Sequence, residues 1–363
     1  MTRTASPPRT AEPMIDLRSD TVTRPTAVML ATIVDADLGD DVMGEDPTVA
    51  ALESRCAELL GKEAGLLVPS GTMANQIAVM ALTRRGDEVV VLPGSHIHEL
   101  ETGALATLSQ VQPRVVAQAG PVPSVDEVVA AIRPTDPDAV QAPETGLVCL
   151  ENAYDLNAGR VLPVALTEQI AHHAHAAGIP VYLDGARIFN AAAALGEDPA
   201  ALCRPVDAVM VCLTKGLGAP VGSVLCGDAD FVRQARKLRQ RLGGGMRQAG
   251  IIAAPALHAL GHHLDRIPED HQRAQRLATG LARLDGVHVD PDAVRTSIVA
   301  ISIDPDVGVP AVRFAAALRQ HGVLAKVIGP DRLRMITHLQ VDDDAVDRVL
   351  QAVGAVLERG AAA

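Results

Sequence analysis

Short runs of apolar residues recur along the chain and alternate with longer amphipathic segments. The runs are rich in Val, Ile and Leu, have the length of buried strands, and are bounded by glycine, proline or charged residues. They occupy residues 14–17, 65–69, 88–93, 147–151, 179–183 and 208–213. Helices are predicted between them, for example at residues 73–82 and 167–177. The alternation predicts an α/β fold, in which a mostly parallel sheet is sandwiched by helices.

One helix boundary is marked by local signals. Asp46 has the residue type of an N-cap, and Pro47 suits the first helical position. A helix is therefore predicted from Pro47 through Leu60.

The pattern changes near residue 258, where longer amphipathic helices alternate with short strands. These strands are predicted at residues 297–303, 323–328 and 333–336. A chain of 363 residues exceeds what one hydrophobic core usually serves. We therefore expect a large domain at residues 14–257, whose N-terminal segment contributes to the site, and a small C-terminal α+β domain at residues 258–363. Residues 1–13 are expected to be a disordered tail.

Two of the apolar runs lead into a charged residue, namely Asp184 and Lys215. Ligands of open α/β sheets bind beyond the carboxyl ends of the strands, so both side chains are expected at one site. Either residue alone would more often serve solubility. However, Lys215 precedes the glycine-rich segment GLGAPVG, which lets backbone pass close to a bulky ligand, and Asp184 precedes Arg187, a cation suited to a substrate carboxylate.

This pair matches the needs of the coenzyme pyridoxal phosphate (PLP). A lysine amine forms a Schiff base with its aldehyde, and a carboxylate keeps its pyridine nitrogen protonated, so that the ring accepts electrons from a bond broken at Cα. Gly71 and Thr72 lie between a predicted strand and a predicted helix, where free N–H groups and a hydroxyl suit a phosphate. Such a turn is often only a helix cap. It supports a phosphate site here because Lys215 and Asp184 follow later in the chain.

Four further residues are candidates by position. His96 follows the predicted strand at 88–93, where an imidazole suits stacking on a coenzyme ring or proton transfer. His98 follows two residues later, but no other ligand stands at a metal-binding spacing, so no metal site is expected. Ser19 belongs to a polar turn whose hydroxyls can also bind a carboxylate. Arg247, just after a triple glycine, is a candidate to reach a phosphate across a subunit boundary.

Composition narrows the class of ligand to small molecules. The net charge is −12 and aromatic residues are scarce, which disfavours a nucleic-acid partner. No apolar run has membrane-spanning length, and residues 1–13 lack the apolar core of a signal peptide. The five cysteines contain no CxxC pair, which is typical of buried thiols in a reducing compartment. We therefore expect a cytoplasmic protein without a membrane or nucleic-acid partner.

Seven short motifs are spread over residues 14–350. They read IDLRSDTVTRPT, GDDVMGEDPTV, PSGTMANQ, LDGARIFNA, LTKGLGAPVGS, GGGMRQAG and RLRMITHL. Together they resemble the threonine aldolase / β-eliminating lyase family of PLP-dependent enzymes. The resemblance implies an aspartate aminotransferase-like fold and a homodimer or homotetramer with active sites at the subunit interface. It also implies cleavage of a β-hydroxy-α-amino acid, such as L-threonine or L-allo-threonine, to glycine and an aldehyde.

The resemblance also assigns residues to the coenzyme. The implied cofactor-binding set is Lys215, Asp184, Gly71, Thr72, His96, Arg187 and Arg247. In this set Lys215 corresponds to the Schiff-base lysine and Asp184 to the partner of the pyridine nitrogen. His96 would stack on the ring, and Arg247 would arrive from the neighbouring subunit.

The implied substrate-binding residues are Ser19, Arg187 and Arg334, which would hold the substrate carboxylate. Fixing that carboxylate decides which Cα bond stands perpendicular to the coenzyme plane and therefore breaks. The implied catalytic set is Lys215, His96 and Tyr154.

Two departures from the family pattern bear on the substrate and the base. Tyr154 stands where a histidine often contacts the substrate hydroxyl, and its ordinary pKa of about 10 makes it a weak base near neutrality. His96 or a water molecule is the alternative base. Met43 replaces a usual tyrosine, which favours a bulkier, for example aromatic, substituent on Cβ.

Several alternatives stay open at this point. Other enzymes of the same fold use the same lysine and aspartate, so a β-eliminating lyase, an amino-acid racemase or a transaminase is the main alternative. A PLP-binding protein without catalysis is another. A nucleotide-binding protein is disfavoured, because no GxGxxG follows a strand and no GxxxxGK[ST] occurs.

Overall fold

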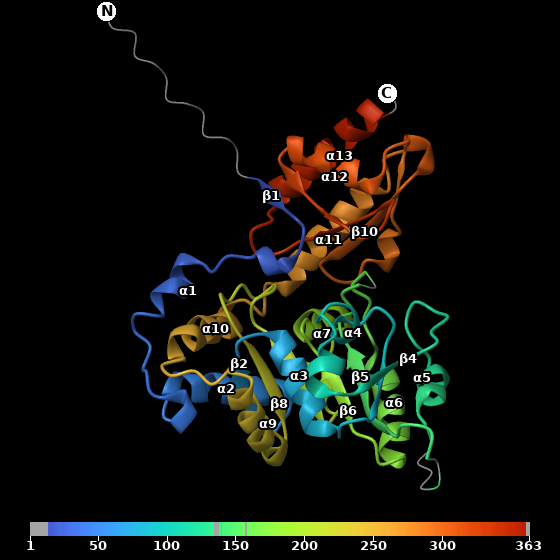
Figure 1. Ribbon diagram of the computed structural model, residues 1–363. Helices are drawn as coiled ribbons and strands as arrows, with labels where there is room; N and C mark the ends of the chain where they lie inside the picture. The colour runs from blue at the N-terminus through green and yellow to red at the C-terminus, as the bar shows by residue number, and fades with distance from the viewer. Residues whose placement is uncertain (1–13, 134–137, 139, 157, 361–363) are drawn as a thin grey trace, which may run out of the picture.

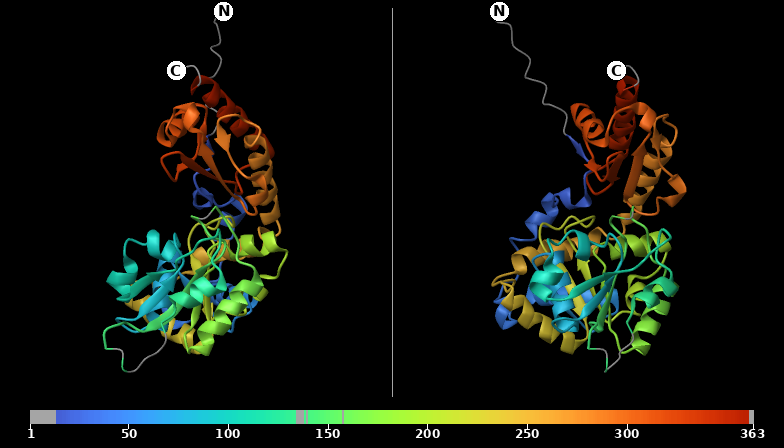
Figure 2. Two further views of the ribbon diagram at one scale, coloured as in Figure 1. Left: turned by 90° about the vertical axis from the view of Figure 1, so that its right-hand side faces the viewer. Right: turned by 45° about the vertical axis from the view of Figure 1, so that its right-hand side comes forward.

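The computed structural model describes residues 14–133, 138, 140–156 and 158–360, and the predicted tail at residues 1–13 lies outside this range. The described chain forms a large unit around a seven-stranded sheet and a smaller unit around a four-stranded sheet (Figures 1 and 2). The predicted α/β class with a second, smaller α+β unit is confirmed.

The large sheet has the strand order β2-β8-β7-β6-β5-β3-β4. Its strands are β2 (Ala64–Val68), β3 (Glu88–Val91), β4 (Gln112–Val115), β5 (Thr145–Glu151), β6 (Val181–Asp184), β7 (Ala208–Cys212) and β8 (Ser223–Gly227). Only β8 runs antiparallel to its neighbours. The five predicted strands of this unit are confirmed, whereas β4 and β8 were not predicted. The sequence of β4, QPRV, lacks an apolar run because β4 lies at the edge of the sheet.

Helices cover both faces of this sheet. Helices α3 (Gly71–Leu82) and α9 (Ala229–Arg241) pack on one face, against strand residues such as Leu66, Val89 and Tyr182. The alternate strand residues, such as Leu67, Val90 and Leu183, face the other helices. These are α2 (Pro47–Leu60), α5 (Val125–Ala131), α6 (Val164–Ala176), α7 (Ile188–Leu195), α8 (Pro199–Cys203) and α10 (Gly250–His262). The strands are apolar throughout because both of their faces are buried.

Helix α2 begins and ends at the predicted residues. The Asp46 side chain accepts a hydrogen bond from the Val49 N–H at 3.0 Å, and Pro47 is the first helical residue. Gly61 ends the helix with a φ of 63°, a conformation that glycine adopts without strain.

The smaller unit has an antiparallel sheet of order β12-β13-β10-β9, covered by three helices. Its elements are α11 (Ile267–Leu281), β9 (Val287–His288), β10 (Ile298–Ile303), α12 (Ala311–Gln320), β12 (Lys326–Val327), β13 (Arg332–Ile336) and α13 (Asp343–Gly360). The single strand predicted at residues 323–328 is wrong. It is divided into β11 (Val323–Leu324), which pairs with β1 (Ile15–Asp16), and β12, which pairs with β13.

The N-terminal segment joins the two units. Ile15 and Leu17 lie in the hydrophobic core of the smaller unit, and the Ile336 N–H donates to the Leu17 carbonyl at 2.9 Å. A few residues later, the Thr23 hydroxyl donates to the Lys215 carbonyl at 2.9 Å in the large unit. The predicted domain boundary at residues 257/258 stays a prediction. It falls inside α10, which packs in the core of the large unit.

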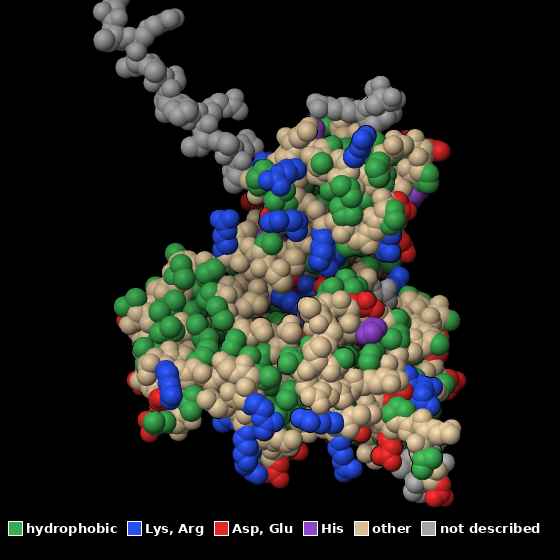
Figure 3. All heavy atoms as spheres, in the orientation of Figure 1, with side chains coloured by type: hydrophobic (Ala, Val, Ile, Leu, Met, Phe, Trp, Pro, Cys, Tyr) green, Lys and Arg blue, Asp and Glu red, His purple; other side chains and the backbone are tan. Residues whose placement is uncertain are grey.

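Apolar side chains are exposed around the short helix α1 (Ala27–Ala31), at the left of the large unit in Figure 3. We call this the apolar patch, and its members are Val28, Leu30, Val34, Leu38 and Met43. Within the described residues, no helix combines the length and the apolar character needed to cross a membrane.

Candidate active site

Several predicted site residues meet at the carboxyl edge of the parallel strands. Asp184 is the last residue of β6, and Lys215 follows the end of the neighbouring strand β7. His96 begins the short helix α4 (His96–Glu99) after β3, and Glu151 ends β5, paired in register with Asp184. The parallel arrangement brings these ends together, as expected for the ligand site of an open sheet.

The carboxylate of Asp184 is buried and held on both oxygens. Oδ2 accepts a hydrogen bond from Asn75 Nδ2 at 2.8 Å, and Oδ1 accepts one from the Ala186 N–H at 3.0 Å. Asn75 is itself fixed, because its Oδ1 accepts the Tyr182 hydroxyl at 2.7 Å and its Nδ2 also donates to Glu101 at 2.7 Å. This network fixes the orientation of the carboxylate.

The imidazole of His96 is held by the same network. Its Nδ1 lies 3.0 Å from Glu101 Oε1, and Glu101 Oε2 accepts a hydrogen bond from Gln76 Nε2 at 2.7 Å. The hydrogen bond with Glu101 raises the pKa of His96 against the opposing effect of burial, and Asp184 adds to the rise. The Glu101 carboxylate therefore stabilises the protonated form of the ring. No cluster of three or more metal-ligating side chains occurs in the parts of the chain that the structure describes.

Glu151 links two loops of the site. Its Oε2 accepts the His96 N–H at 2.7 Å, and its Oε1 accepts the Asp155 N–H at 2.8 Å. Burial raises the pKa of Glu151 to about 7, and the nearby charge of Asp184 acts in the same direction. Glu151 was not predicted from the sequence, although its place at the end of a predicted strand was a usable signal.

We expect Glu151 to make the protein less stable as the pH rises. Its folded-state pKa of about 7 lies above the ordinary glutamate value of 4.5, so the unfolded chain releases this proton first as the pH rises. The stabilising contribution is complete below the unfolded pKa and is lost as the pH rises through 7. Between pH 5 and pH 8 the loss amounts to roughly 2 kcal/mol. Urea unfolding across this range measures it. Glu151→Gln removes this titration. If the free energy of unfolding depends on pH as strongly in Glu151→Gln as in the native chain, the assignment is contradicted.

The start of helix α3 offers backbone N–H groups to an anion. Ser70 caps the helix by accepting the Met73 N–H, the N–H groups of Gly71 and Thr72 precede the intrahelical hydrogen bonds, and the Thr72 side chain is exposed beside them. A Cβ atom on Gly71 would lie 2.7 Å from Met210 Cε and 2.8 Å from Cys212 Sγ. A larger residue would therefore displace these two side chains of β7.

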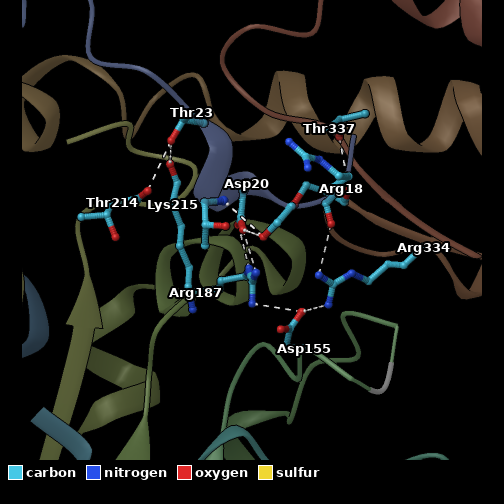
Figure 4. Close-up of polar contacts among 12 residues, drawn as sticks. Arg18, Asp20, Thr23, Asp155, Arg187, Thr214, Lys215, Arg334 and Thr337 are labelled. Atoms are coloured by element: carbon cyan, nitrogen blue, oxygen red, sulfur yellow. Dashed lines mark hydrogen bonds and ion pairs between the residues drawn. The ribbon is translucent and has the colours of Figure 1, made fainter. Parts of the chain in front are cut away.

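Two buried arginines face each other across a carboxylate (Figure 4). Arg187 donates from Nε and Nη2 to both oxygens of Asp20, each at 2.7 Å. Arg334, on β13 of the smaller unit, donates from Nη1 to Asp155 Oδ1 at 2.6 Å, and Arg187 Nη1 lies 3.4 Å from the same atom. The predicted pair of arginines thus lies in one place. Neither of their acidic partners was predicted in this role, because each contact joins distant parts of the chain.

Electrostatic interactions connect this cluster to the predicted lysine. Although burial opposes the shift, Arg187 holds the pKa of Asp20 below its usual value, and Lys215 contributes to the lowering. Ser19 stands next to Asp20, donates to its Oδ1 at 3.3 Å and is half-buried. Lys215 is half-buried as well. These predicted residues therefore surround one region, at the junction of the two units.

Two predicted residues are not brought to this region. Tyr154 is fully buried in the hydrophobic core, and its hydroxyl donates to the Pro93 carbonyl. Burial raises the pKa of Tyr154 further above its ordinary value. The predicted catalytic role of Tyr154 is therefore not supported, because its hydroxyl points to backbone. Arg247 is 61% exposed and pairs with Asp40 at 2.8 Å, so within one chain it contacts no other predicted site residue.

The residues present fit PLP. Lys215 offers an amine, the buried Asp184 a carboxylate for the ring nitrogen, His96 a ring that can stack, and the start of α3 backbone N–H groups for a phosphate. When bound, PLP withdraws electrons from a bond at the substrate Cα.

Comparisons with known proteins identify the family of the chain. The model of the beta-eliminating lyase family matches residues 16–304. A low-specificity L-threonine aldolase of Arabidopsis thaliana is 41% identical over 339 residues, which cover 93% of this chain and 94% of that protein. An alanine racemase of Cochliobolus carbonum is 33% identical over 354 residues, which cover 94% of this chain and 87% of that protein. The structure of a Leishmania major threonine aldolase superposes with a TM-score of 0.78 at 18% identity, over 94% of this chain and 99% of that one, and shows a common fold. The chain therefore belongs to the beta-eliminating lyase family and is a PLP-dependent lyase.

Proposed function

We propose that the protein cleaves L-threonine, L-allo-threonine or a bulkier β-hydroxy-α-amino acid to glycine and an aldehyde. One observation carries the proposal: the buried side chains of Arg187 and Arg334 converge on Asp155, which interacts electrostatically with Lys215. A substrate carboxylate held by these arginines sets the Cα–Cβ bond perpendicular to the coenzyme plane, the orientation in which it can break. The Arabidopsis relative is a low-specificity L-threonine aldolase, which supports this proposal.

The proposal gives each residue a separate task. Arg187, Arg334 and the hydroxyl of Ser19 bind the substrate carboxylate, and Lys215 provides the amine that carries the coenzyme. Asp184 keeps the ring nitrogen protonated. His96, whose Nδ1 is held 3.0 Å from Glu101, or a water molecule removes the hydroxyl proton.

A product assay with a substrate panel tests the proposal. The purified protein with PLP is incubated with L-threonine, L-allo-threonine, phenylserine and L-alanine. We expect an aldehyde and glycine in equal amounts from the hydroxy amino acids, and no keto acid. Formation of D-alanine without aldehyde would favour a racemase, which the Cochliobolus relative makes the main alternative. Strong preference for threonine over phenylserine would contradict the bulky substituent inferred from Met43, which is 69% exposed here.

We also propose that the protein is a homodimer or homotetramer in the cytoplasm. The apolar patch is an expected contact between copies, since exposed apolar clusters commonly mark interfaces. Arg247 is exposed, follows the glycines of residues 243–245 and pairs with Asp40 in its own chain, so it would exchange this pair for a phosphate in a neighbouring copy. The five cysteines are free and buried, which suits a reducing compartment. Light scattering of the native protein measures the number of copies.

A further inference from the structure

The carboxylate of Asp155 lies where two arginine side chains converge (Figure 4). Its Oδ1 accepts from Arg334 Nη1 at 2.6 Å and lies 3.4 Å from Arg187 Nη1. Both arginine side chains are 2% exposed, and the Asp155 side chain is 10% exposed. The contact is therefore a largely desolvated ion pair in which Asp155 is the more exposed partner.

The remaining nitrogens of the two arginines are largely committed. Nε and Nη2 of Arg187 are both taken by Asp20, so Nη1 is the nitrogen left for a ligand. Arg334 gives Nη2 to the Arg18 carbonyl at 3.3 Å, and its buried Nε has no hydrogen-bond partner in the described structure. Apart from Arg334 Nε, a second carboxylate that enters the cluster competes with Asp155 for Nη1 of both arginines.

We propose that Asp155 holds the place of the substrate carboxylate between Arg187 and Arg334, so that substrate binding exchanges one carboxylate for another. The proposal rests on the function proposed above, because it takes these arginines as the carboxylate site. Asp155 is then a specificity-determining residue. It disfavours ligands whose only attachment is a carboxylate.

Competition for the two guanidinium groups favours the exchange. With Asp20 and Asp155 in place, each guanidinium group already has a carboxylate partner. Lys215 is a further cation that interacts electrostatically with both carboxylates. A substrate carboxylate that takes Nη1 of Arg187 and of Arg334 displaces Asp155 from them, because two carboxylates that share one buried cation are costly away from water.

The structure offers the displaced side chain a destination. The Asp155 backbone is held by Glu151, so a side-chain rotation suffices. Lys326 stands opposite Arg334 in the β12–β13 pair, is exposed, and interacts electrostatically with Asp155. It is a cation that can receive the carboxylate at the solvent side.

The exchange predicts how affinity depends on Asp155. A ligand that competes with an internal group binds with an affinity reduced by the fraction of time that the site is free. An amino-acid substrate overcomes this competition through its other attachments, whereas acetate does not. Removing the charge of Asp155 should therefore improve the binding of acetate and of substrate, with little effect on the chemical step.

The test compares Asp155→Asn with the native chain, both with PLP bound. We expect the KM for L-threonine and the dissociation constant of acetate each to fall about tenfold, while kcat changes less than about threefold. Acetate binding is measured by calorimetry and by the thermal unfolding midpoint at constant ionic strength, so this readout does not depend on turnover. Asp155→Ala should act in the same direction and serves if the first variant folds poorly.

Two control variants locate the effect. Asp347→Asn removes a carboxylate that pairs with Arg276 on the outer surface of the smaller unit, and it should change neither constant. Arg334→Gln added to Asp155→Asn should abolish the gain in acetate binding, which places acetate between the arginines.

Unchanged acetate binding in Asp155→Asn, or a higher KM, would overturn the exchange, as would an equal gain in Asp347→Asn. A different outcome would contradict the proposed function and leave the exchange intact. If the native chain releases no aldehyde while Asp155→Asn still binds acetate more tightly, the exchange stands and the aldolase activity does not.

Discussion

Replacement of Lys215 by alanine is expected to abolish the release of aldehyde from L-threonine, with kcat lower by about a thousandfold or more. The reason is positional. Lys215 follows β7 at the sheet edge that carries Asp184, and it interacts electrostatically with Asp20, Asp155 and His96. An alanine leaves no amine there to carry the coenzyme or to return a proton to the substrate carbon. Aldehyde release is measured with a coupled reductase at saturating substrate.

Lys237→Ala is the matched control, because Lys237 is an exposed lysine on α9, away from this edge. It should retain native activity. Thermal unfolding of both variants separates loss of the amine from loss of the fold. A folded Lys215→Ala protein that keeps more than about a tenth of native kcat would remove Lys215 from the proposed mechanism.

The part of the site that follows from strand ends could be predicted from the sequence. Asp184 and Lys215 each follow an apolar run whose length and composition identify a buried strand. Once the strands are parallel neighbours, their carboxyl ends lie together by geometry. The start of α2 was predictable for a similar reason, since the signals for a helix cap lie within four residues of sequence.

The contacts between distant segments could not be predicted in this way. Asp20 is 167 residues from Arg187, and Asp155 is 179 residues from Arg334. The sequence identifies four charged residues but contains no local signal that pairs them. Tyr154 shows the same limit, because its hydroxyl is buried against the carbonyl of Pro93, 61 residues away. Its residue type suggested catalysis, while the path of the loop after β5 places it in the core.

Replacement of Asp184 by asparagine is expected to lower kcat for threonine cleavage by about a hundredfold or more. The side chain keeps its shape but loses the charge that holds the ring nitrogen of PLP protonated. The surrounding hydrogen bonds also oppose the change. Both Asp184 oxygens accept hydrogen bonds, from Asn75 and from the Ala186 N–H, so an amide group must present N–H to a donor on one side. The variant should therefore also be less stable than the native chain.

A carboxylate at the opposite end of the same strand provides the control for Asp184. Asp207 accepts the Val181 N–H at 2.7 Å at the start of β6, and Asp207→Asn removes the same charge without touching the site. It should lower stability slightly and leave kcat unchanged. Asp184→Glu retains the charge and should recover part of the activity that Asp184→Asn loses. If Asp184→Glu is as inactive as Asp184→Asn, geometry rather than charge decides the rate. If Asp184→Asn is as active as the native chain, this carboxylate does not face the coenzyme, and the assignment of the whole sheet edge fails.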